Sequence, residues 1–296
     1  MANTINKAKM YVTLLDELYR DALKTDVLSA PSELIKAGNS VGEVLIPKIT
    51  LDALGDYSRT DGYPSGDITF EWETHTFSYD RAIEFTLGRQ NNLEALDVPF
   101  TAASSQFVKQ GAAPEIDAVR FAEMYGSAGT TVQADLTVTD TVEAIDTAVA
   151  EMRNKEVSKE GMYLFLTTTV LKNIKNSELF DRDINTVGDR SIPAYDGIPI
   201  IVIPQGRFYS AITLNDGSTT FGYEKCTIVD EEGYNLNFMI VHSQAALPVV
   251  KQQNMKIFTP EQNQTKDGWL MQYRLYHDIF TPDNKVNGIY AHEALA

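Results

Sequence analysis

The sequence predicts an α+β protein with two lobes, and three segments carry this prediction. Residues 67–88 alternate apolar and polar side chains with the period of a β-strand. Residues 96–129 can be read as one long helix, and residues 137–250 alternate between helical and strand-like patterns. Strands followed by a long helix are typical of an α+β lobe, whereas the alternating part is typical of an α/β lobe. With 296 residues, the chain is long enough to give each lobe a core.

The clearest β-pattern lies at residues 67–88. The alternation holds over residues 68–73 and returns over residues 83–87, with Thr74–Asp80 between the two runs. We expect these runs to form a long hairpin or twisted ribbon. A two-stranded ribbon is marginally stable alone in water, so its aromatic side chains need a partner surface on the same chain or on another copy. The residues predicted to lie at a contact between subunits are Phe70, Trp72, Phe77, Tyr79, Arg81 and Phe85.

The residues that precede this β-pattern are predicted to form a helix, a strand and a loop. Residues 4–28 are amphipathic, and a helix packed on its own domain and an arm packed on a neighbouring subunit are equally compatible with them. Residues 41–49 read as a strand, and Pro47 places it near a sheet edge. Residues 54–67 are rich in Gly, Asp, Ser and Pro and are predicted to be a loop.

The long helical segment carries Ile116, Val119 and Met124 at helical spacing, with charged residues between them. Pro114 lies in its middle. Because proline lacks a backbone N–H and crowds the carbonyl four residues back, we expect a bend at Pro114 rather than a break. No group of catalytic residue types lies near this helix in the sequence. A long helix of this kind is more typical of a structural element than of an active site.

The second half of the chain predicts an α/β lobe from about residue 137 to residue 250. Its predicted helices are 139–155 and 170–177, and its predicted strands are 162–168 and 235–242. Residues 195–204 are predicted to be a turn at Asp196–Gly197 followed by a strand that Pro204 ends. Residues 243–253 read as a helix interrupted near Pro248. The strand-like residues 267–294 are expected to return and pair with the early strand at 41–49, which otherwise lacks a partner.

Charge and cysteine content exclude some classes of function. The net charge is −16, from 25 basic and 41 acidic residues. Such a surface repels phosphates, which argues against groove reading or wrapping of nucleic acid, although enclosing it at a distance is compatible with the charge. The single cysteine, Cys226, excludes an intrachain disulfide. We expect no secretory signal and no membrane span, because no apolar run approaches the required length.

Residue types that carry catalysis or bind metals are present but not clustered. The four histidines show no metal-ligand spacing, and His277–Asp278 are strand neighbours that face opposite sides. A metal-dependent hydrolase using Asp181, Asp183 and His242 is the remaining enzyme hypothesis, but Asp181–Asp183 lacks the glycine and the closing glutamate of a calcium loop. We therefore predict no catalytic residue, no metal site and no cofactor, and a protein that is not an enzyme.

Seven segments, in order, resemble the major capsid protein of tailed bacteriophages, whose fold is shared with encapsulins and the herpesvirus capsid floor. They span about residues 40–294. The specificity lies in their order rather than in any single motif. The segments are VGEVLIPKITLDALGDYSR, WETHTFSYDRAIEFTLGRQN, PEIDAVRFAEMY, MYLFLTTTVLKNI, YDGIPIIVIP, NFMIVHSQAALPVVKQQNMKIFTP and RLYHDIFTPDNKVNGIYAHEA.

The resemblance implies a domain organisation. Its parts are an N-terminal arm (1–40), a peripheral-domain strand and loop (41–66), an extended loop (67–90), a peripheral domain with the spine helix (91–136), an axial domain (137–250) and C-terminal peripheral-domain strands (251–296). In this family the extended loop lies over an adjacent subunit, and the axial domain meets its copies around the five-fold and six-fold centres. The sequence has no long charged N-terminal extension of the fused-scaffold type, and nothing marks a Lys–Asn pair for covalent cross-linking.

The resemblance also implies a function. It predicts a structural subunit that assembles through hexamers and pentamers into an icosahedral shell around double-stranded phage DNA, without sequence-specific binding and without a membrane. The implied partners are many copies of the chain itself, with portal, scaffolding and decoration proteins as further partners. The implied location is the virion, after assembly in the host cytoplasm. An encapsulin-type compartment shell is the alternative within the same fold.

Overall fold

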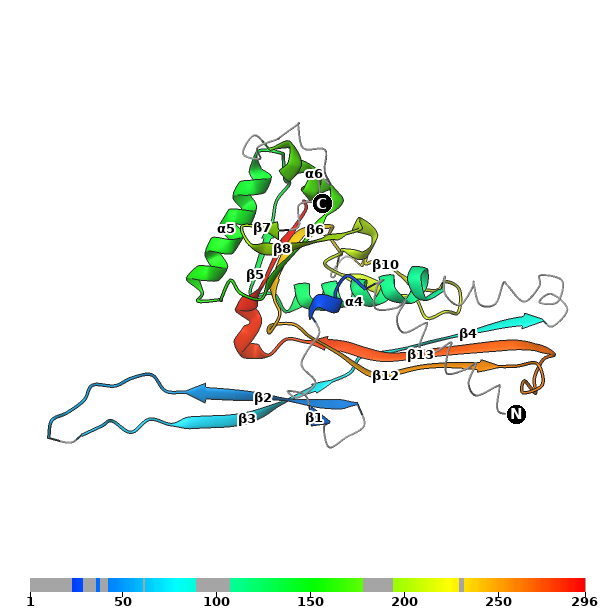
Figure 1. The fold of residues 1–296 in the computed structure, drawn as a ribbon, viewed down its shortest axis with the longest axis horizontal. Helices are drawn as coiled ribbons and strands as arrows, with labels where there is room; N and C mark the ends of the chain where they lie inside the picture. Colours follow the sequence, from blue (N-terminus) through cyan, green and yellow to red (C-terminus); the bar gives the residue numbers. More distant parts are fainter. Residues whose placement is uncertain are drawn as a thin grey trace.

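The computed structural model describes residues 23–28, 36–37, 42–60, 62–88, 107–177, 194–228 and 232–295. Most of the predicted N-terminal helix or arm lies outside these ranges, as do residues 96–106 of the predicted long helix. Asp181 and Asp183, of the hydrolase hypothesis, lie outside them as well. Helices and strands are mixed, as predicted for an α+β fold (Figure 1). No helix among the described residues is long and apolar enough to cross a membrane.

Six of the described strands form the mixed sheet of the α/β lobe (Figure 1). In order across the sheet they are β5 (Thr130–Gln133), β14 (Ile289–Glu293), β11 (Leu236–His242), β6 (Met162–Thr167), β8 (Ile198–Ile203) and β7 (Ala194–Tyr195). The helices α5 (Asp140–Asn154) and α6 (Thr168–Asn176) pack their apolar side chains on one face of it. The helices and strands predicted between residues 137 and 242 are thus confirmed, with ends shifted by a few residues at most.

A second sheet contains the three longest strands of the body, β12 (Leu247–Phe258), β13 (Gly268–Phe280) and β4 (Tyr79–Gly88), in that order. Its apolar face packs on the start of α4 (Ala113–Gly126) and on the π-helical turn η3 before it (Val108–Ala112). The other end of α4 packs on the six-stranded sheet through Phe121 and Met124. One helix therefore contacts both sheets.

Pro114 does not interrupt this helix. The chain is helical from residue 107 to residue 126, and the turn directly before Pro114 is widened, with the N–H of Ala113 bonded to the carbonyl of Val108. Proline has no N–H to give to the carbonyl four residues back, and its ring crowds that carbonyl. A π-helical turn at this place removes the conflict without ending the helix. The predicted continuation through Pro114 is confirmed, while the bend there stays a prediction.

A buried polar junction joins α4 to two other segments. The carboxylate of Asp117 is fully buried and accepts hydrogen bonds from the backbone N–H groups of Lys24 and Thr25, each at 3.2 Å. It also accepts a hydrogen bond, of 3.1 Å, from Nη1 of Arg207. Arg207 lies in the 3-10 turn η4 (Gln205–Arg207). Arg120 donates to the Thr25 hydroxyl at 2.8 Å. The junction fixes the chain just before the 3-10 turn η1 (Asp26–Leu28) against the helix.

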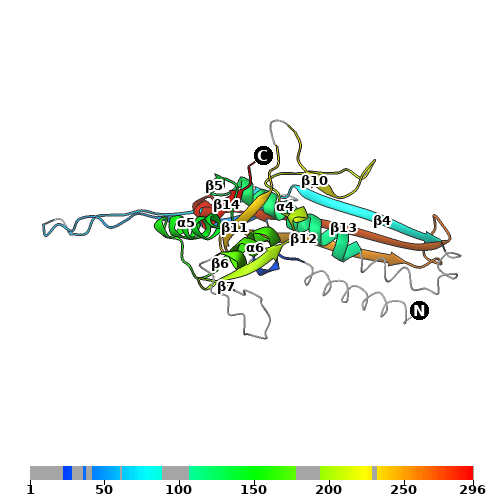
Figure 2. The ribbon, with the colours of Figure 1, turned by 90° about the horizontal axis from the view of Figure 1, so that it is seen from above.

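The strand β3 (Ile68–Thr76) pairs with β2 (Glu43–Leu51) and not with β4. The antiparallel register runs from Glu43 opposite Thr76 to Leu51 opposite Ile68, and the short strand β1 (Lys36–Ala37) pairs with the base of β2. Residues 43–76, hereafter the ribbon, project from the body in both views (Figures 1 and 2). The hairpin predicted within residues 67–88 is therefore wrong, and the projecting segment moves from 67–90 to 43–76.

Two residues between β3 and β4 explain this pairing. The N–H of Phe77 bonds to the carbonyl of Gly42 at 2.9 Å, and the N–H of Ser78 bonds to Oδ2 of Asp278 at 2.8 Å. Phe77 and Ser78 thus carry the chain from one sheet to the next instead of turning it back. The loop at residues 52–67, which is rich in glycine and aspartate, makes the hairpin turn instead.

The C-terminal part of the chain differs from the prediction in two further ways. The predicted helix at 243–253 is wrong, because residues 243–245 form a turn and β12 begins at Leu247. β12 is an outer strand among the described strands of its sheet, a position that tolerates a proline such as Pro248. The predicted pairing of residues 267–294 with the strand at 41–49 is also wrong. β13 pairs with β12 and β4, and β14 joins the six-stranded sheet beside β11. Alternation predicted these strands, but not their partners.

Candidate interaction surface

The register of the ribbon gives it two chemically different faces. Pro47 lies opposite Trp72, Ile49 opposite Phe70, and Leu51 opposite Ile68. Directly paired residues lie on the same face of a sheet, so these six form one continuous apolar surface, here called the apolar ribbon face. The opposite face carries Thr50 across from Thr69 and Lys48 across from Glu71.

Most of the apolar ribbon face is exposed to solvent in the described chain. The exposed fraction is 73% for Ile68, 64% for Leu51, 55% for Ile49, 53% for Phe70 and 39% for Trp72. The rings of Phe70 and Trp72 meet edge to face, with centroids 5.3 Å apart. Single exposed apolar residues are ordinary, but a contiguous set on a projecting element marks an interaction surface.

At the base of the ribbon the opposite face is the apolar one. Val44 and Ile46 are buried and pack with Phe77, Leu247 and Phe280 of the body. The core of the chain thus uses one face of the ribbon at its base, and the outer part presents the other face to solvent. The apolar ribbon face is therefore not an extension of the chain's own core.

The tip of the ribbon is also apolar. Leu54 is fully exposed, and the rings of Tyr57 and Tyr63 meet with centroids 5.0 Å apart while both remain largely exposed. The loop is held by the N–H of Asp67, which donates to Oδ2 of Asp52 at 2.8 Å. These contacts give the loop a defined shape that carries its aromatic side chains outward.

The structure places the six residues predicted at a subunit contact in three different environments. Phe70 and Trp72 lie on the apolar ribbon face. Phe77 is buried between Tyr276 and Phe280, at centroid distances of 5.0 and 5.3 Å. Because it lies in the core of its own chain, Phe77 does not belong to the interaction surface.

The other three predicted residues belong to β4. The hydroxyl of Tyr79 donates to Glu123 on α4, and burial, followed by this bond, raises the pKa of Tyr79. Nε of Arg81 lies 2.6 Å from Oε1 of Glu115, and its Nη1 donates to the carbonyl of Asn215 at 2.8 Å. Phe85 packs edge to face on Phe107 at 5.2 Å and stays 40% exposed. Contacts within the chain therefore account for the side chains of Tyr79 and Arg81.

Sequence reasoning missed Ile49, Leu51 and the tip residues of this surface. A signal for the first two was present, because the apolar positions change phase within one strand. They are even-numbered at Val44 and Ile46 and odd-numbered at Ile49 and Leu51. A strand whose apolar side switches along its length meets two different surfaces.

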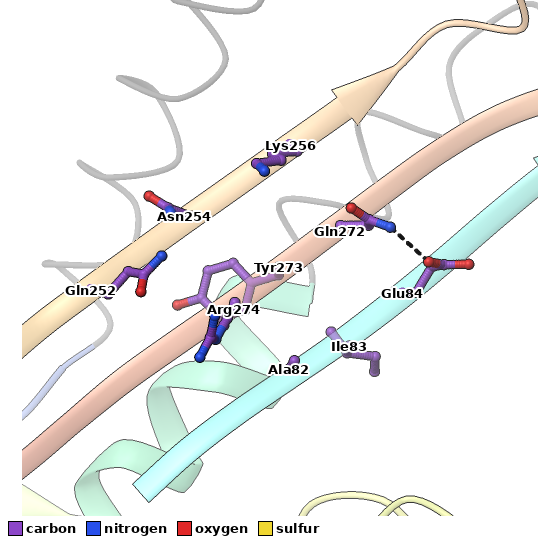
Figure 3. Close-up of a pocket in the computed structure, with 9 residues that line it drawn as sticks. All are labelled: Ala82, Ile83, Glu84, Gln252, Asn254, Lys256, Gln272, Tyr273 and Arg274. Carbon is purple, nitrogen blue, oxygen red and sulfur yellow. Dashed lines mark hydrogen bonds between the residues drawn. The ribbon is translucent and has the colours of Figure 1, made fainter. Parts of the chain in front are cut away.

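A shallow groove of about 450 Å³ lies on the three-stranded sheet (Figure 3). The amide side chains of Gln252, Asn254 and Gln272 line it, and Gln272 donates to Oε2 of Glu84 at 2.9 Å. Arg274 reaches Asp80 with two bonds, of 2.9 and 2.6 Å, which lower the pKa of Asp80. Cross-strand pairs of this kind are typical of a solvated sheet face, so the groove offers no activated group for catalysis.

The residues that the sequence analysis considered for catalysis make contacts within the chain. His277 is fully buried, and Asp278 accepts bonds from the backbone N–H groups of Ser78 and Ile279, each at 2.8 Å. The ring of His242 lies 3.0 Å from the carbonyl of Glu160 and accepts the N–H of Gln244. The described residues contain no group of three or more His, Cys, Asp or Glu side chains that could hold a metal ion.

No protein-family model and no curated protein matches this chain. Solved structures do match it along most of its length. The mature capsid of bacteriophage PhiM1 has a TM-score of 0.62 at 10% identity, over 86% of this chain and 83% of that one. The capsid of cyanophage P-SCSP1u has a TM-score of 0.59 at 14% identity, over 88% and 85%. A Gordonia phage Cozz structure has a TM-score of 0.59 at 13% identity, over 93% and 87%. The chain has the fold of tailed-phage major capsid proteins, as predicted.

Proposed function

We propose that this chain is a structural capsid protein whose copies assemble into a closed shell. The observation that carries the proposal is the apolar ribbon face. It projects from the body, lies opposite to the face that the chain's own core uses, and is largely exposed among the described residues. A second copy is the occupant that this surface fits, because the matching solved structures are capsids built of many subunits.

The physical properties of the chain support a shell subunit. Burying about 800 Å² per partner is typical of a specific protein interface, and in a shell each such contact repeats by symmetry. Many modest contacts can therefore hold the shell without one tight pair. The net charge of −16 limits adhesion between the wall and enclosed nucleic acid.

The finer parts of the proposal follow the resemblance to tailed-phage capsid proteins. They are assembly through hexamers and pentamers, an icosahedral shell, enclosure of double-stranded phage DNA, and a place in the virion after assembly in the host cytoplasm. Portal, scaffolding and decoration proteins are the further partners of such a shell. The chain would act as a wall component and not as an enzyme.

A matched pair of variants tests the proposal. Ile49→Ser with Phe70→Ser changes one cross-strand pair of the apolar ribbon face, and Thr50→Ser with Thr69→Ser changes the neighbouring pair on the other face. We expect electron micrographs of the purified native chain and of the threonine variant to show uniform closed particles. The first variant should remain folded but form at least tenfold fewer particles.

Two results would contradict the proposal. If the native chain forms only monomers under all assembly conditions, it is not a shell protein. If both variants assemble equally well, the apolar ribbon face is not a subunit contact. Shells that enclose protein cargo instead of DNA would favour the encapsulin-type compartment.

A further inference from the structure

A hairpin of the α/β lobe extends to the three-stranded sheet. It consists of the strands β9 (Ile212–Leu214) and β10 (Tyr223–Lys225), which pair with each other in the antiparallel direction. The chain enters it after β8 and returns from it to the six-stranded sheet at β11. Figures 1 and 2 show β10 beside α4. Residues 212–225 are here called the strap.

The strap is fixed at its base but thinly packed beyond it. Just before β9, the ring of Phe208 is fully buried and packs edge to face on Phe121 of α4, with centroids 4.7 Å apart. The residues of β9 and β10 are all half-buried or exposed, and Phe221 in the loop between them is 68% exposed. Burial of apolar surface therefore contributes little to holding the far end of the strap in place.

One side chain of the three-stranded sheet holds that far end. Arg81 of β4 donates through Nη1 to the carbonyl of Asn215, at 2.8 Å, and through Nη2 to the carbonyl of Gly222, at 3.3 Å. These two residues close the loop of the strap, since the N–H of Asn215 donates to the carbonyl of Gly222 at 2.9 Å. Nε of Arg81 lies 2.6 Å from Oε1 of Glu115 on α4. The planar guanidinium thus joins β4, α4 and the strap, in a geometry that the ammonium group of a lysine cannot reproduce.

The chain itself passes between the lobes at a different place. The connection from β11 to β12 lies beside the 3-10 helix η5 (Asp283–Gly288), which connects β13 to β14, because a Cβ on Gly288 would lie only 2.6 Å from that of Ala245. The N–H of Gly129, just after α4, donates to the carbonyls of Val286 and Ile289, at 2.9 and 3.1 Å. These connections therefore meet near the C-terminal end of α4. Figure 1 shows η5, in red, and the strap toward opposite ends of this helix.

We propose that the strap is an interlobe latch, in which Arg81 fixes the angle between the three-stranded sheet and the α/β lobe. Chain connections gathered at one end allow a small rotation about that end. Arg81 binds in the first turn of α4, about 16 Å along the helix from Gly126, and at this distance it limits the rotation. Its bonds to a carboxylate and two carbonyls are charge-assisted but bury little apolar surface. The latch can therefore open without unfolding either sheet.

Double electron–electron resonance on unassembled full-length subunits tests the angle between the lobes. Spin labels are attached at Ala150→Cys on α5 and Lys256→Cys on β12, both of which are exposed. All chains carry Cys226→Ala, so that only these two sites take a label. The parent chain should give one narrow distribution of distances. Arg81→Met should at least double its width, and hydrogen exchange in residues 212–225 should become at least threefold faster, with no comparable change in β6.

The matched control is Arg274→Met. Arg274 pairs with Asp80 on the solvated face of the same sheet and makes no contact with the strap, so this variant should keep the parent's distances and exchange. An unchanged distribution in Arg81→Met overturns the proposal, even if exchange in the strap is faster, and so does equal broadening in the control.

A second variant decides if Arg81→Met does not fold. Arg81→Lys keeps the positive charge beside Glu115 but cannot reach both carbonyls of the strap, so exchange in residues 212–225 should still be faster and the distribution broader. Parental values of both in Arg81→Lys also overturn the proposal. These measurements use single subunits, so the latch can fail while the proposed function stands.

Discussion

The strands β3 and β4 follow each other with two residues between them and carry similar alternating patterns. They nevertheless pair with different strands and differ in how far their apolar faces are buried. The strand β4 pairs with β13, and Ile83 on it packs under α4 with Tyr273. The strand β3 pairs with β2 and leaves Phe70 and Trp72 in solvent. The difference lies in what covers their apolar faces, since α4 lies over that of β4, whereas the outer part of β3 stays largely exposed.

This difference shows how to separate a core strand from an interaction strand. An alternating sequence indicates that a strand has an apolar face. It does not indicate which element covers this face, because that element lies elsewhere in the chain or on another chain. Here the boundary is Phe77, which is buried in the body while its neighbours on β3 project. Substitutions on either side of this boundary should therefore affect different properties.

The largest effect on stability is expected in the covered region, at Asp117. Asp117→Ala leaves Arg207 and the N–H groups of Lys24 and Thr25 without their buried acceptor. Breaking a buried charged pair by removing one partner typically costs about 3–5 kcal/mol. We expect a loss of that size in the free energy of unfolding, measured in urea.

The control for this substitution is Asp117→Asn, which keeps the shape and one acceptor oxygen. It should lose less, about 1–3 kcal/mol, because part of the hydrogen bonding survives. If Asp117→Ala costs less than about 1 kcal/mol, the junction does not hold α4 against its neighbours in the way that its contacts indicate.

The next effect compares two phenylalanines seven positions apart. Phe77→Ala removes a buried ring packed on Tyr276 and Phe280, and we expect a loss of about 3 kcal/mol in the free energy of unfolding. Phe70→Ala, on the apolar ribbon face, should stay within about 0.5 kcal/mol of the native chain. Chemical denaturation of subunits measures both. Equal losses would mean that the ribbon belongs to the core of its own chain.

The sequence allowed the nature of most described elements to be predicted, because their periodicities are local properties. Residues 162–167 are almost continuously apolar and form a central strand, and residues 140–154 have helical spacing and form α5. The fold could be predicted from the order of such segments. Strand pairing could not, since it depends on contacts between distant residues such as Ser78 with Asp278.

The candidate surface was predictable only in part, for a related reason. Phe70 and Trp72 were identified because they are aromatic and alternate, but the same criterion selected Phe77, which the body buries. The six residues of the apolar ribbon face come from two strands whose register brings them together. The phase change within residues 43–51 indicates two surfaces, but which residues share the exposed one follows only from their pairing with residues 68–72.

The smallest of these effects on stability concerns a buried histidine, His277, on the covered side of the boundary. His277, on β13, is fully buried, stacks on Tyr79 at 6.0 Å, and has no hydrogen-bond partner for its ring nitrogens among the described residues. Burial, followed by the charges of Arg120 and Arg81, lowers the pKa of His277 to about 3. An unfolded histidine has a pKa of about 6.5, so below that pH the unfolded chain binds a proton that the native chain does not.

The native chain should therefore lose stability as the pH falls below 6.5, by up to about 1.4 kcal/mol per pH unit from this residue, or about 2 kcal/mol by pH 5. His277→Phe keeps the stacked ring and removes the titration, so its loss between pH 7 and pH 5 should be smaller by that amount. Urea unfolding at the two pH values measures the difference, and effects of Asp278 and other groups common to both chains cancel. Parallel losses in the two chains would show that His277 takes up its proton while folded.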